Sequence, residues 1–214
     1  MTASKKYLFK TAAGIGVLAA ASAAWLAMAP AALASVELNK PAPAFTAVDA
    51  NGKPLALDAY KGKTVVLEWT NHECPYVKKH YESGNIPKLQ QEAAGKGVVW
   101  LQVVSSAPGK QGHVDGATAQ KLNGERKAAP AATVLDPDGK VGKLYGAQTT
   151  PHIFIVNPAG QLVYKGGIDS IATANKDDLA KAENYVSAAL AAIGAGKPVE
   201  KANTKPYGCA VKYG

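Results

Sequence analysis

The stretch that decides the fold is TVVLEWTNHECPYVKK, residues 64–79. Its first six residues are β-branched or apolar apart from Glu68, which is typical of a buried central strand. Cys74 and Pro75 follow, and proline is tolerated in the first turn of a helix because its missing N–H group would have no partner there. We therefore expect a strand over residues 64–69 and a helix that begins at Cys74 or Pro75.

Cys74 has two interpretations. At the start of a helix, free backbone N–H groups and the positive end of the helix dipole favour the thiolate, which is the reactive form of cysteine. This placement predicts a nucleophile or a redox site. The alternative is a small buried residue between two elements, since free cysteine packs as a hydrophobic side chain. The rest of the chain favours the first interpretation.

The N-terminal residues have the pattern of a secretory signal peptide. Three lysines among the first ten residues precede an alanine-rich apolar run over residues 11–29, and the small residues ALA at 32–34 supply a cleavage site. We expect residues 1–34 to be a signal peptide cleaved after Ala34, which sends the chain to the periplasm or outside the cell without a membrane anchor. An uncleaved anchor is the alternative, because the apolar run approaches spanning length. Its alanine content makes it weakly hydrophobic, which favours cleavage.

Removal of this segment leaves 180 of the 214 residues, enough for one domain with its own core. We expect that domain over residues 35–196, followed by a coil tail over residues 197–214 that carries Cys209. The remaining 21 basic and 16 acidic residues are scattered, which indicates a solvated surface rather than a nucleic-acid interface. Cys74 and Cys209 both enter an oxidising compartment, where two cysteines form a disulfide or a redox couple.

Strands alternate with helices along the rest of the chain. Asn51-Gly52-Lys53 is typical of a hairpin turn. The last helix, expected over residues 177–193, has an apolar stripe at helical spacing and ends at Gly194. The other expected elements are strands over residues 98–104, 132–135, 153–156 and 162–165 and helices over residues 86–94 and 117–122. This alternation predicts an α/β fold with helices around a mixed β-sheet.

The order of these elements, with Cys74-Pro75 after the first core strand and Thr150-Pro151 before the hairpin, resembles the thioredoxin-like superfamily. More narrowly, the chain is similar to the redoxin and peroxiredoxin-like proteins of bacteria, the alkyl hydroperoxide reductase/thiol-specific antioxidant group. The segments NHECPYVK (71–78) and GCAVKY (208–213) carry this narrower likeness. The resemblance implies a thioredoxin-like α/β/α sandwich and an exported thiol-dependent oxidoreductase or antioxidant that needs no cofactor. The partners it implies are thiols, disulfides or peroxides, with an external thiol as electron donor.

The resemblance also implies roles for the residues around Cys74. Pro151 is expected to be cis and to face Cys74, which leaves the backbone of Thr150 free to pair with an extended substrate. Pro75 and Tyr76, directly after the nucleophile, complete the expected substrate-binding residues.

Glu68 matches the position of the buried acid of thioredoxin. A carboxyl group on an apolar central strand is expected to have a raised pKa through desolvation, which suits proton transfer with a thiol. The alternative is that Glu68 faces a polar rim or pairs with a lysine.

His72 and Glu73 lie next to the nucleophile in the sequence. A protonated His72 would lower the pKa of the Cys74 thiol and Glu73 would raise it, so the sign of their joint effect stays open.

Three departures from the family patterns bear on the reaction. Val77 stands where a thioredoxin-type Cys-x-x-Cys motif needs its second cysteine. Asn71 stands where peroxiredoxins have threonine, although its amide still has a hydrogen bond to donate to a peroxide oxygen. The arginine of peroxiredoxins has no match, because Thr150-Pro151 stands at the corresponding place before the hairpin, and the single arginine, Arg126, falls in an expected loop. The choice between disulfide and peroxide as oxidant therefore stays open.

Cys209 is the candidate resolving thiol, 135 positions after Cys74 in a tail that can fold back across the site. A disulfide that closes so long a loop would stabilise the fold by about 5 kcal/mol, either as a permanent link or as a switchable couple. The alternative to an enzyme is a non-catalytic binding module. It would contain a structural Cys74–Cys209 disulfide, or a soft-metal site made of Cys74 with His72 or His80.

Overall fold

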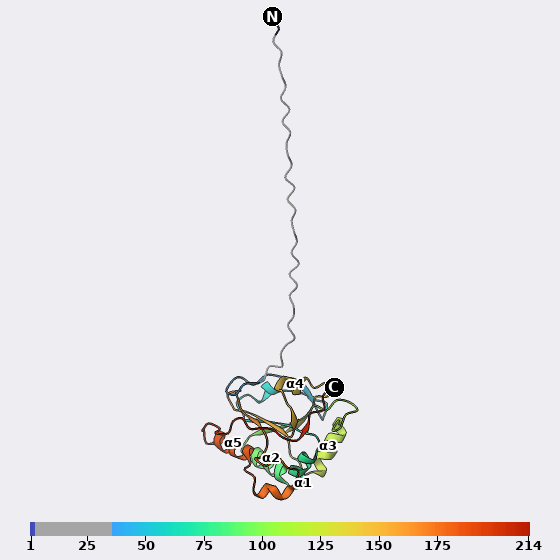
Figure 1. Cartoon of the computed structure of the whole chain (residues 1–214), viewed down its shortest axis with the longest axis vertical. Helices are drawn as coiled ribbons and strands as arrows, with labels where there is room; N and C mark the ends of the chain where they lie inside the picture. The colour runs from blue at the N-terminus through green and yellow to red at the C-terminus, as the bar shows by residue number, and fades with distance from the viewer. Residues whose placement is uncertain (3–35) are drawn as a thin grey trace. The chain divides into compact units, whose positions relative to one another are not determined.

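The computed structural model describes residues 1–2 and 36–214. The predicted signal peptide and its cleavage site after Ala34 therefore lie outside the described residues, apart from Met1 and Thr2. Residues 36–214 belong to one unit of the chain, coloured along its length in Figure 1. Within the described ranges, no helix combines the length and the apolar character needed to cross a bilayer.

The strand predicted over residues 64–69 is β3 (Val65–Trp69), and every residue of it is buried. It pairs in parallel with β4 (Val99–Val104) and antiparallel with β7 (His152–Val156). Across residues 36–214 the large sheet has the strand order β2-β1-β5-β4-β3-β7-β8. Its other strands are β1 (Thr46–Asp49), β2 (Pro54–Ala56), β5 (Ala132–Leu135) and β8 (Leu162–Gly166). The mixed sheet and the hairpin turn at Asn51-Gly52-Lys53 are thus confirmed.

Different helices cover the two faces of this sheet, so the predicted α/β/α sandwich is confirmed (Figure 1). Val66 of β3 packs in one core with α1, α2 and α5, and Leu67 packs in the other core with α4. This division follows from the strand geometry, because successive side chains of a strand point to opposite faces. The helices are α1 (Pro75–Glu82), α2 (Asn85–Gly95), α3 (Gly116–Glu125), α4 (Lys140–Tyr145) and α5 (Tyr185–Gly194), with short 3-10 turns η1 (Leu57–Tyr60) and η2 (Lys176–Ala180).

Helix α1 begins where the sequence predicts. Cys74 is the N-cap residue with an extended backbone, and Pro75 is the first helical residue. The carbonyl oxygen of Cys74 accepts the first hydrogen bond of the helix from the N–H group of Lys78 at 2.9 Å. The sulfur of Cys74 therefore lies at the end of the helix where backbone N–H groups are free.

The prediction of a single helix over residues 177–193 is wrong. The segment forms η2 and then α5, separated at Asn184, whose backbone is extended. The Asn184 side chain accepts a hydrogen bond from the N–H group of Ser187 at 2.9 Å and so caps a new helix. On the other side of the break, the carbonyl oxygen of Glu183 accepts a hydrogen bond from Ser170 at 3.0 Å. The apolar stripe continues across the break, which is why the periodicity alone did not show it.

Helix α4 is not among the elements that the sequence predicts. The carboxylate of Asp136 accepts hydrogen bonds from the N–H groups of Val141 at 3.0 Å and Gly142 at 2.8 Å, and this starts the helix. With six residues, α4 is too short for a helical period to be visible in the sequence.

The C-terminal tail is mostly coil, as predicted, but it contains one short strand. β9 (Cys209–Ala210) pairs antiparallel with β6 (Thr149–Thr150), and Cys209 lies opposite Thr150. Gly208, just before β9, has a φ of 126°, and a Cβ atom there would lie 2.0 Å from the carbonyl oxygen of Thr150. Only glycine allows the tail to approach the residue before Pro151 this closely.

We predict that Gly208→Ala detaches β9 from β6, because the added methyl group overlaps the Thr150 carbonyl group. The expected cost is about 1–3 kcal/mol of stability, with faster alkylation of Cys209 in the folded protein, measured by peptide mapping after timed iodoacetamide treatment. Gly196→Ala is the matched control, because Gly196 also has a positive φ, 67°, but open space around the added atom. Equal alkylation of Cys209 in the two variants would contradict the role of the close approach.

Candidate active site

The thiol of Cys74 faces the residue before Pro151. Its Sγ atom donates a hydrogen bond to the carbonyl oxygen of Thr150 at 3.1 Å. The peptide bond between Thr150 and Pro151 is cis, as the resemblance implied. Cys74 is fully buried, as the packing interpretation expected, but its sulfur contacts polar groups as well as the apolar core.

Cys209 completes the group. Cys209 lies opposite Thr150 in the β6–β9 pair, and the carbonyl oxygen of Thr150 accepts the hydrogen bond of the Cys74 thiol, so both cysteines neighbour the residue before Pro151. The Thr150 hydroxyl group also donates to the carbonyl oxygen of Cys209 at 3.4 Å. Both cysteines are free thiols, Cys74 buried and Cys209 half-buried. The fold thus brings together Cys74, Thr150, Pro151 and Cys209.

The two thiols have opposite acidities. Burial raises the pKa of Cys74, but hydrogen bonds from the Cys209 thiol, the Cys209 N–H group and the Val77 N–H group outweigh it, so the net pKa lies below the ordinary value. Burial and the neighbouring Cys74 raise the pKa of Cys209 to about 11. Cys74 therefore ionises first, and Cys209 remains the protonated donor beside it. This is the arrangement expected for an attacking thiolate and a second thiol.

The residues just before Cys74 shape the loop between β3 and α1. Asn71 is buried, its side-chain oxygen accepts a hydrogen bond from the Glu73 N–H group at 2.9 Å, and its amide donates to the carbonyl oxygen of Gln111 at 3.4 Å. One N–H group of the amide predicted to bind a peroxide oxygen is thus engaged. Burial lowers the pKa of His72, so this imidazole is neutral near pH 7 and supplies no positive charge to the thiolate.

Glu68 is fully buried within a cluster of hydrogen bonds, so the polar-rim alternative is wrong. Its carboxyl oxygens accept hydrogen bonds from Tyr81 Oη at 2.7 Å and Trp100 Nε1 at 2.7 Å. Burial raises the pKa of Glu68 to about 7, against the opposing effect of these donors, which confirms the predicted direction. Among the described residues, its hydrogen-bond partners do not include Cys74, so Glu68 belongs to the surroundings of the site rather than to its centre.

Lys79 is a site residue that sequence reasoning missed. Its side chain and that of Asp169 are 0% and 1% exposed, and they form an ion pair at 3.2 Å. Tyr207, two residues before Cys209, donates a hydrogen bond to Asp169 Oδ1 at 2.5 Å and contacts His80 Nε2 at 3.1 Å. The spacing of Tyr207 and Cys209 in the tail was visible in the sequence, but their partner Asp169 lies in a loop that no motif marks.

The remaining candidate residues, and the single arginine of the sequence, lie away from the Cys74 sulfur or bond to other groups. Pro75 is exposed, and the ring of Tyr76 packs edge-on against Tyr207 with 5.8 Å between centroids. Arg126 stacks over the ring of Tyr81 at 4.2 Å and so lies with the Glu68 cluster. Both ring nitrogens of His80 are hydrogen-bonded, to Tyr207 and to Asn85, which argues against a soft-metal site with Cys74. In the described part of the chain, no group of three or more His, Cys, Asp or Glu residues is arranged to hold a metal ion.

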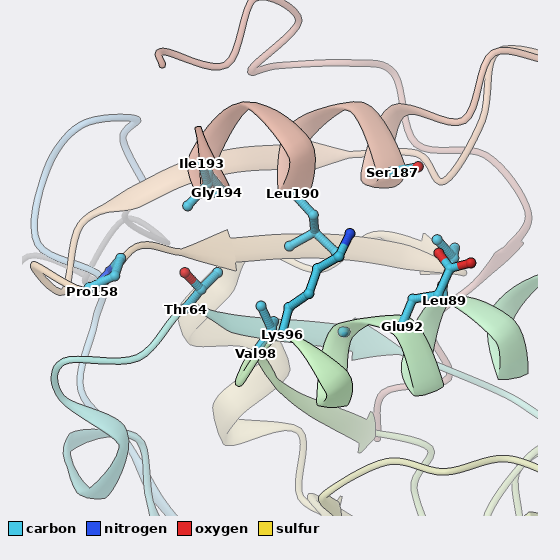
Figure 2. A pocket seen from close by; sticks show the side chains of 11 residues that line it. Thr64, Leu89, Glu92, Lys96, Val98, Pro158, Ser187, Leu190, Ile193 and Gly194 are labelled. Carbon is cyan, nitrogen blue, oxygen red and sulfur yellow. The ribbon is translucent and has the colours of Figure 1, made fainter. Parts of the chain in front are cut away.

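A separate apolar groove lies between α2 and α5, with a volume of about 220 Å³ (Figure 2). Leu89 of α2 and Lys96, the residue just after that helix, line one side, and Leu190 of α5 lines the other. The groove contains neither cysteine, so we place the site at the cysteine pair, where the polar and reactive groups converge.

The fold and the paired thiols define a thioredoxin-fold redox protein. Residues 37–185 match the family model Redoxin, which is more than half of the chain, and the chain therefore belongs to the Redoxin family. No curated protein is similar enough to count as a match.

Solved structures support the same fold. The crystal structure of an uncharacterized conserved protein from Geobacillus kaustophilus has a TM-score of 0.70 at 24% identity, covering 85% of this chain and 94% of that chain. A hypothetical protein from Sinorhizobium meliloti 1021 has a TM-score of 0.66 at 24% identity, covering 84% of this chain and 96% of that one. A proposed thiol:disulfide interchange protein, DsbE, from Chlorobium tepidum has a TM-score of 0.50 at 21% identity, covering 61% of this chain and 85% of that chain. At these identities the likeness shows the fold alone.

We predict that Cys209→Ala raises the pKa of Cys74, because it removes the thiol that donates a hydrogen bond to the Cys74 sulfur. Alkylation of Cys74 at pH 7 should slow by about tenfold, the effect of losing one hydrogen bond to a charged group. Cys209→Ser keeps an O–H donor at the same place and should stay closer to the wild type. The measurement is the rate of Cys74 alkylation by iodoacetamide across pH, and identical profiles for the two variants would contradict the assigned hydrogen bond.

We also predict that Glu68 makes the protein less stable as pH rises. The folded state holds the Glu68 proton up to a pKa of about 7, whereas the ordinary value is 4.5. Between these two pH values the folded state binds more protons than the unfolded state, so stability falls by about 3 kcal/mol as pH rises through this window. Glu68→Gln should remove this loss. Urea unfolding of both proteins at pH 5 and pH 8 measures it, and the same pH dependence in both would exclude Glu68 as its source.

Proposed function

We propose that this Redoxin family member is an exported thiol-dependent oxidoreductase in which Cys74 attacks the oxidant and Cys209 resolves the product. The observation that carries the proposal is the contact between the two thiols. Cys209 lies beside Cys74 on a strand paired with the residue before Pro151. This contact lowers the pKa of the attacking thiol and places the second thiol beside it.

With a hydroperoxide as oxidant, the reaction has two steps. The Cys74 thiolate attacks the nearer oxygen, the S–O bond forms as the O–O bond breaks, and the leaving alkoxide or hydroxide takes up a proton. Cys209 then attacks the sulfur of the sulfenic acid, the S–S bond forms as the S–O bond breaks, and the Cys209 proton leaves with the hydroxide as water. The peroxide gains two electrons, and the two thiols become a disulfide.

A small oxidant suits the closed site. β9 occupies the strand edge at Thr150, and Cys74 is fully buried beneath it. A protein segment cannot pair with Thr150 until β9 leaves, whereas a hydroperoxide needs only a small opening beside the sulfur. Asn71 has one N–H of its amide engaged with Gln111, which leaves the other N–H as a donor for a peroxide oxygen.

Thiol–disulfide exchange with a protein is the second candidate. It is favoured by the Thr150 backbone, which pairs with a cysteine-bearing strand in this structure. In that reaction the Cys74 thiolate displaces one sulfur of the substrate disulfide, and Cys209 then displaces the other, so that the substrate is released as two thiols. This reaction needs the tail to open first.

Export and an external thiol donor complete the proposal. The N-terminal signal pattern supports transfer to the periplasm or beyond, where a dithiol donor would restore the reduced pair by exchange. Cys209 is the more exposed of the two sulfurs and is the expected point of attack by that donor.

A quenched thiol trap tests the function. The reduced protein is mixed with one equivalent of hydrogen peroxide, and in parallel with a disulfide-linked peptide, and is alkylated at timed intervals for mass spectrometry. We expect a Cys74–Cys209 disulfide in the wild type and a sulfenic acid at Cys74 in Cys209→Ser, detected with dimedone. Cys74→Ser is the matched control and should show neither species. The faster of the two oxidants identifies the substrate class.

Two outcomes would oppose the proposal. The first is a wild-type protein that forms no oxidised species and turns over neither substrate. The second is a disulfide that is present from the start and resists dithiol reductants, which would indicate the structural link of a binding module.

A further inference from the structure

A buried charged cluster connects the segments that carry the two cysteines. It consists of Lys79 and His80 from α1, Asp169 from the loop after β8, and Tyr207 from the tail. Lys79 Nζ lies 3.2 Å from Asp169 Oδ2 and 3.1 Å from the carbonyl oxygen of Ile171. Tyr207 Oη donates to the other oxygen of Asp169 at 2.5 Å and lies 3.1 Å from His80 Nε2.

The cluster lies on the same two segments of the chain as the two thiols. Cys74 is the N-cap of the helix that contains Lys79 and His80, and Tyr207 lies two residues before Cys209. The ring of Tyr207 also packs against Tyr76, two residues after Cys74. The hydroxyl group of Tyr207 thus fixes the tail to the helix that has Cys74 as its N-cap residue.

We propose that Tyr207, held by Lys79 and Asp169, is a positioning residue that keeps the thiol of Cys209 against the sulfur of Cys74. The inference rests on the proposed function, in which Cys209 resolves the product formed at Cys74. It adds that the tail is aligned by one charge-assisted hydrogen bond in the protein interior.

Stability alone does not account for the cluster. Apolar side chains of similar volume often replace a buried ion pair with no loss of stability, because both charges must be removed from water. A charge-assisted hydrogen bond is short and directional, and it selects one arrangement of the groups that it joins. That property suits alignment of a strand as short as β9, whose two residues contribute few bonds of their own.

Bonds on the other side of Cys209 provide a comparison. Tyr213 Oη donates to the carbonyl oxygen of Ala147 at 2.8 Å, and the Val211 N–H group donates to the carbonyl oxygen of Gln148 at 3.0 Å. Tyr213 is therefore a tail tyrosine with one hydroxyl hydrogen bond and no contact with the buried ion pair. It serves as the matched control for Tyr207.

The test compares Tyr207→Phe with Tyr213→Phe in the full chain. Each protein is mixed with hydrogen peroxide, and acid-quenched samples give the rate at which the sulfenic acid at Cys74 becomes the disulfide. We expect Tyr207→Phe to slow this step by about tenfold, the effect of losing one hydrogen bond to a charged group. Tyr213→Phe should change it by less than about twofold, as expected for a neutral bond near the surface.

A second readout does not depend on turnover. Because the Cys209 groups that bond to Cys74 become misplaced, Tyr207→Phe should shift the pH profile of Cys74 alkylation upward, and Tyr213→Phe should not. Asp169→Asn keeps an oxygen for the Tyr207 hydroxyl group but removes the charge, and it should slow disulfide formation as well. A purely structural cluster would lower the unfolding temperature without moving the pH profile.

The results separate the inference from the function. If the wild type forms no disulfide, the proposed function fails, and the pH profiles still decide whether Tyr207 positions Cys209. If the wild type forms the disulfide and Tyr207→Phe keeps both the rate and the profile, the positioning role is overturned while the function stands. Equal slowing in the two tyrosine variants would also overturn it, because any loosening of the tail would then suffice.

Discussion

The short pairing of β9 with β6 is the contact on which the reactive part of this protein depends. Thr150 takes part twice, since its carbonyl oxygen accepts the Cys74 thiol and its backbone lies opposite Cys209. Burial disfavours a thiolate, and the Val77 N–H group at the helix start is only one of the donors that oppose it. Without the effect of Cys209, burial would raise the pKa of Cys74 toward that of an ordinary buried thiol. A segment far along the chain thus affects the pKa of the residue at the helix start.

Polar groups within the core give helix α1 a fixed orientation around this contact. Lys79 bonds to Asp169 on one part of the helix, and Tyr81 donates to Glu68 on another. Each cluster is satisfied by several partners, as buried polar groups must be if the low dielectric of the interior is not to penalise them. The helix that begins at Cys74 is therefore anchored by directional bonds as well as by apolar packing.

Local patterns were enough to predict the strand, the cysteine and the helix that follows it, because residues 64–79 carry both the apolar strand and the start signal of the helix. The cis bond before Pro151 came from the family resemblance and not from composition. The pairing of Cys209 with Thr150 could not be derived, since it depends on contacts between distant segments and on a glycine that permits close approach. The same applies to Lys79, whose buried partner Asp169 lies 90 positions away. Asn71 has the polarity expected of a site residue, and its hydrogen bonds in this structure are with Glu73 and Gln111.

Placement of the second thiol near the chain end leaves the usual Cys-x-x-Cys position free for packing. Val77 stands there and is fully buried against the sheet. The two sulfurs consequently belong to separate segments, a helix anchored in the core and a strand paired with the residue before Pro151. A covalent link between them would therefore tie the tail to the start of α1, which two cysteines on one helix could not do.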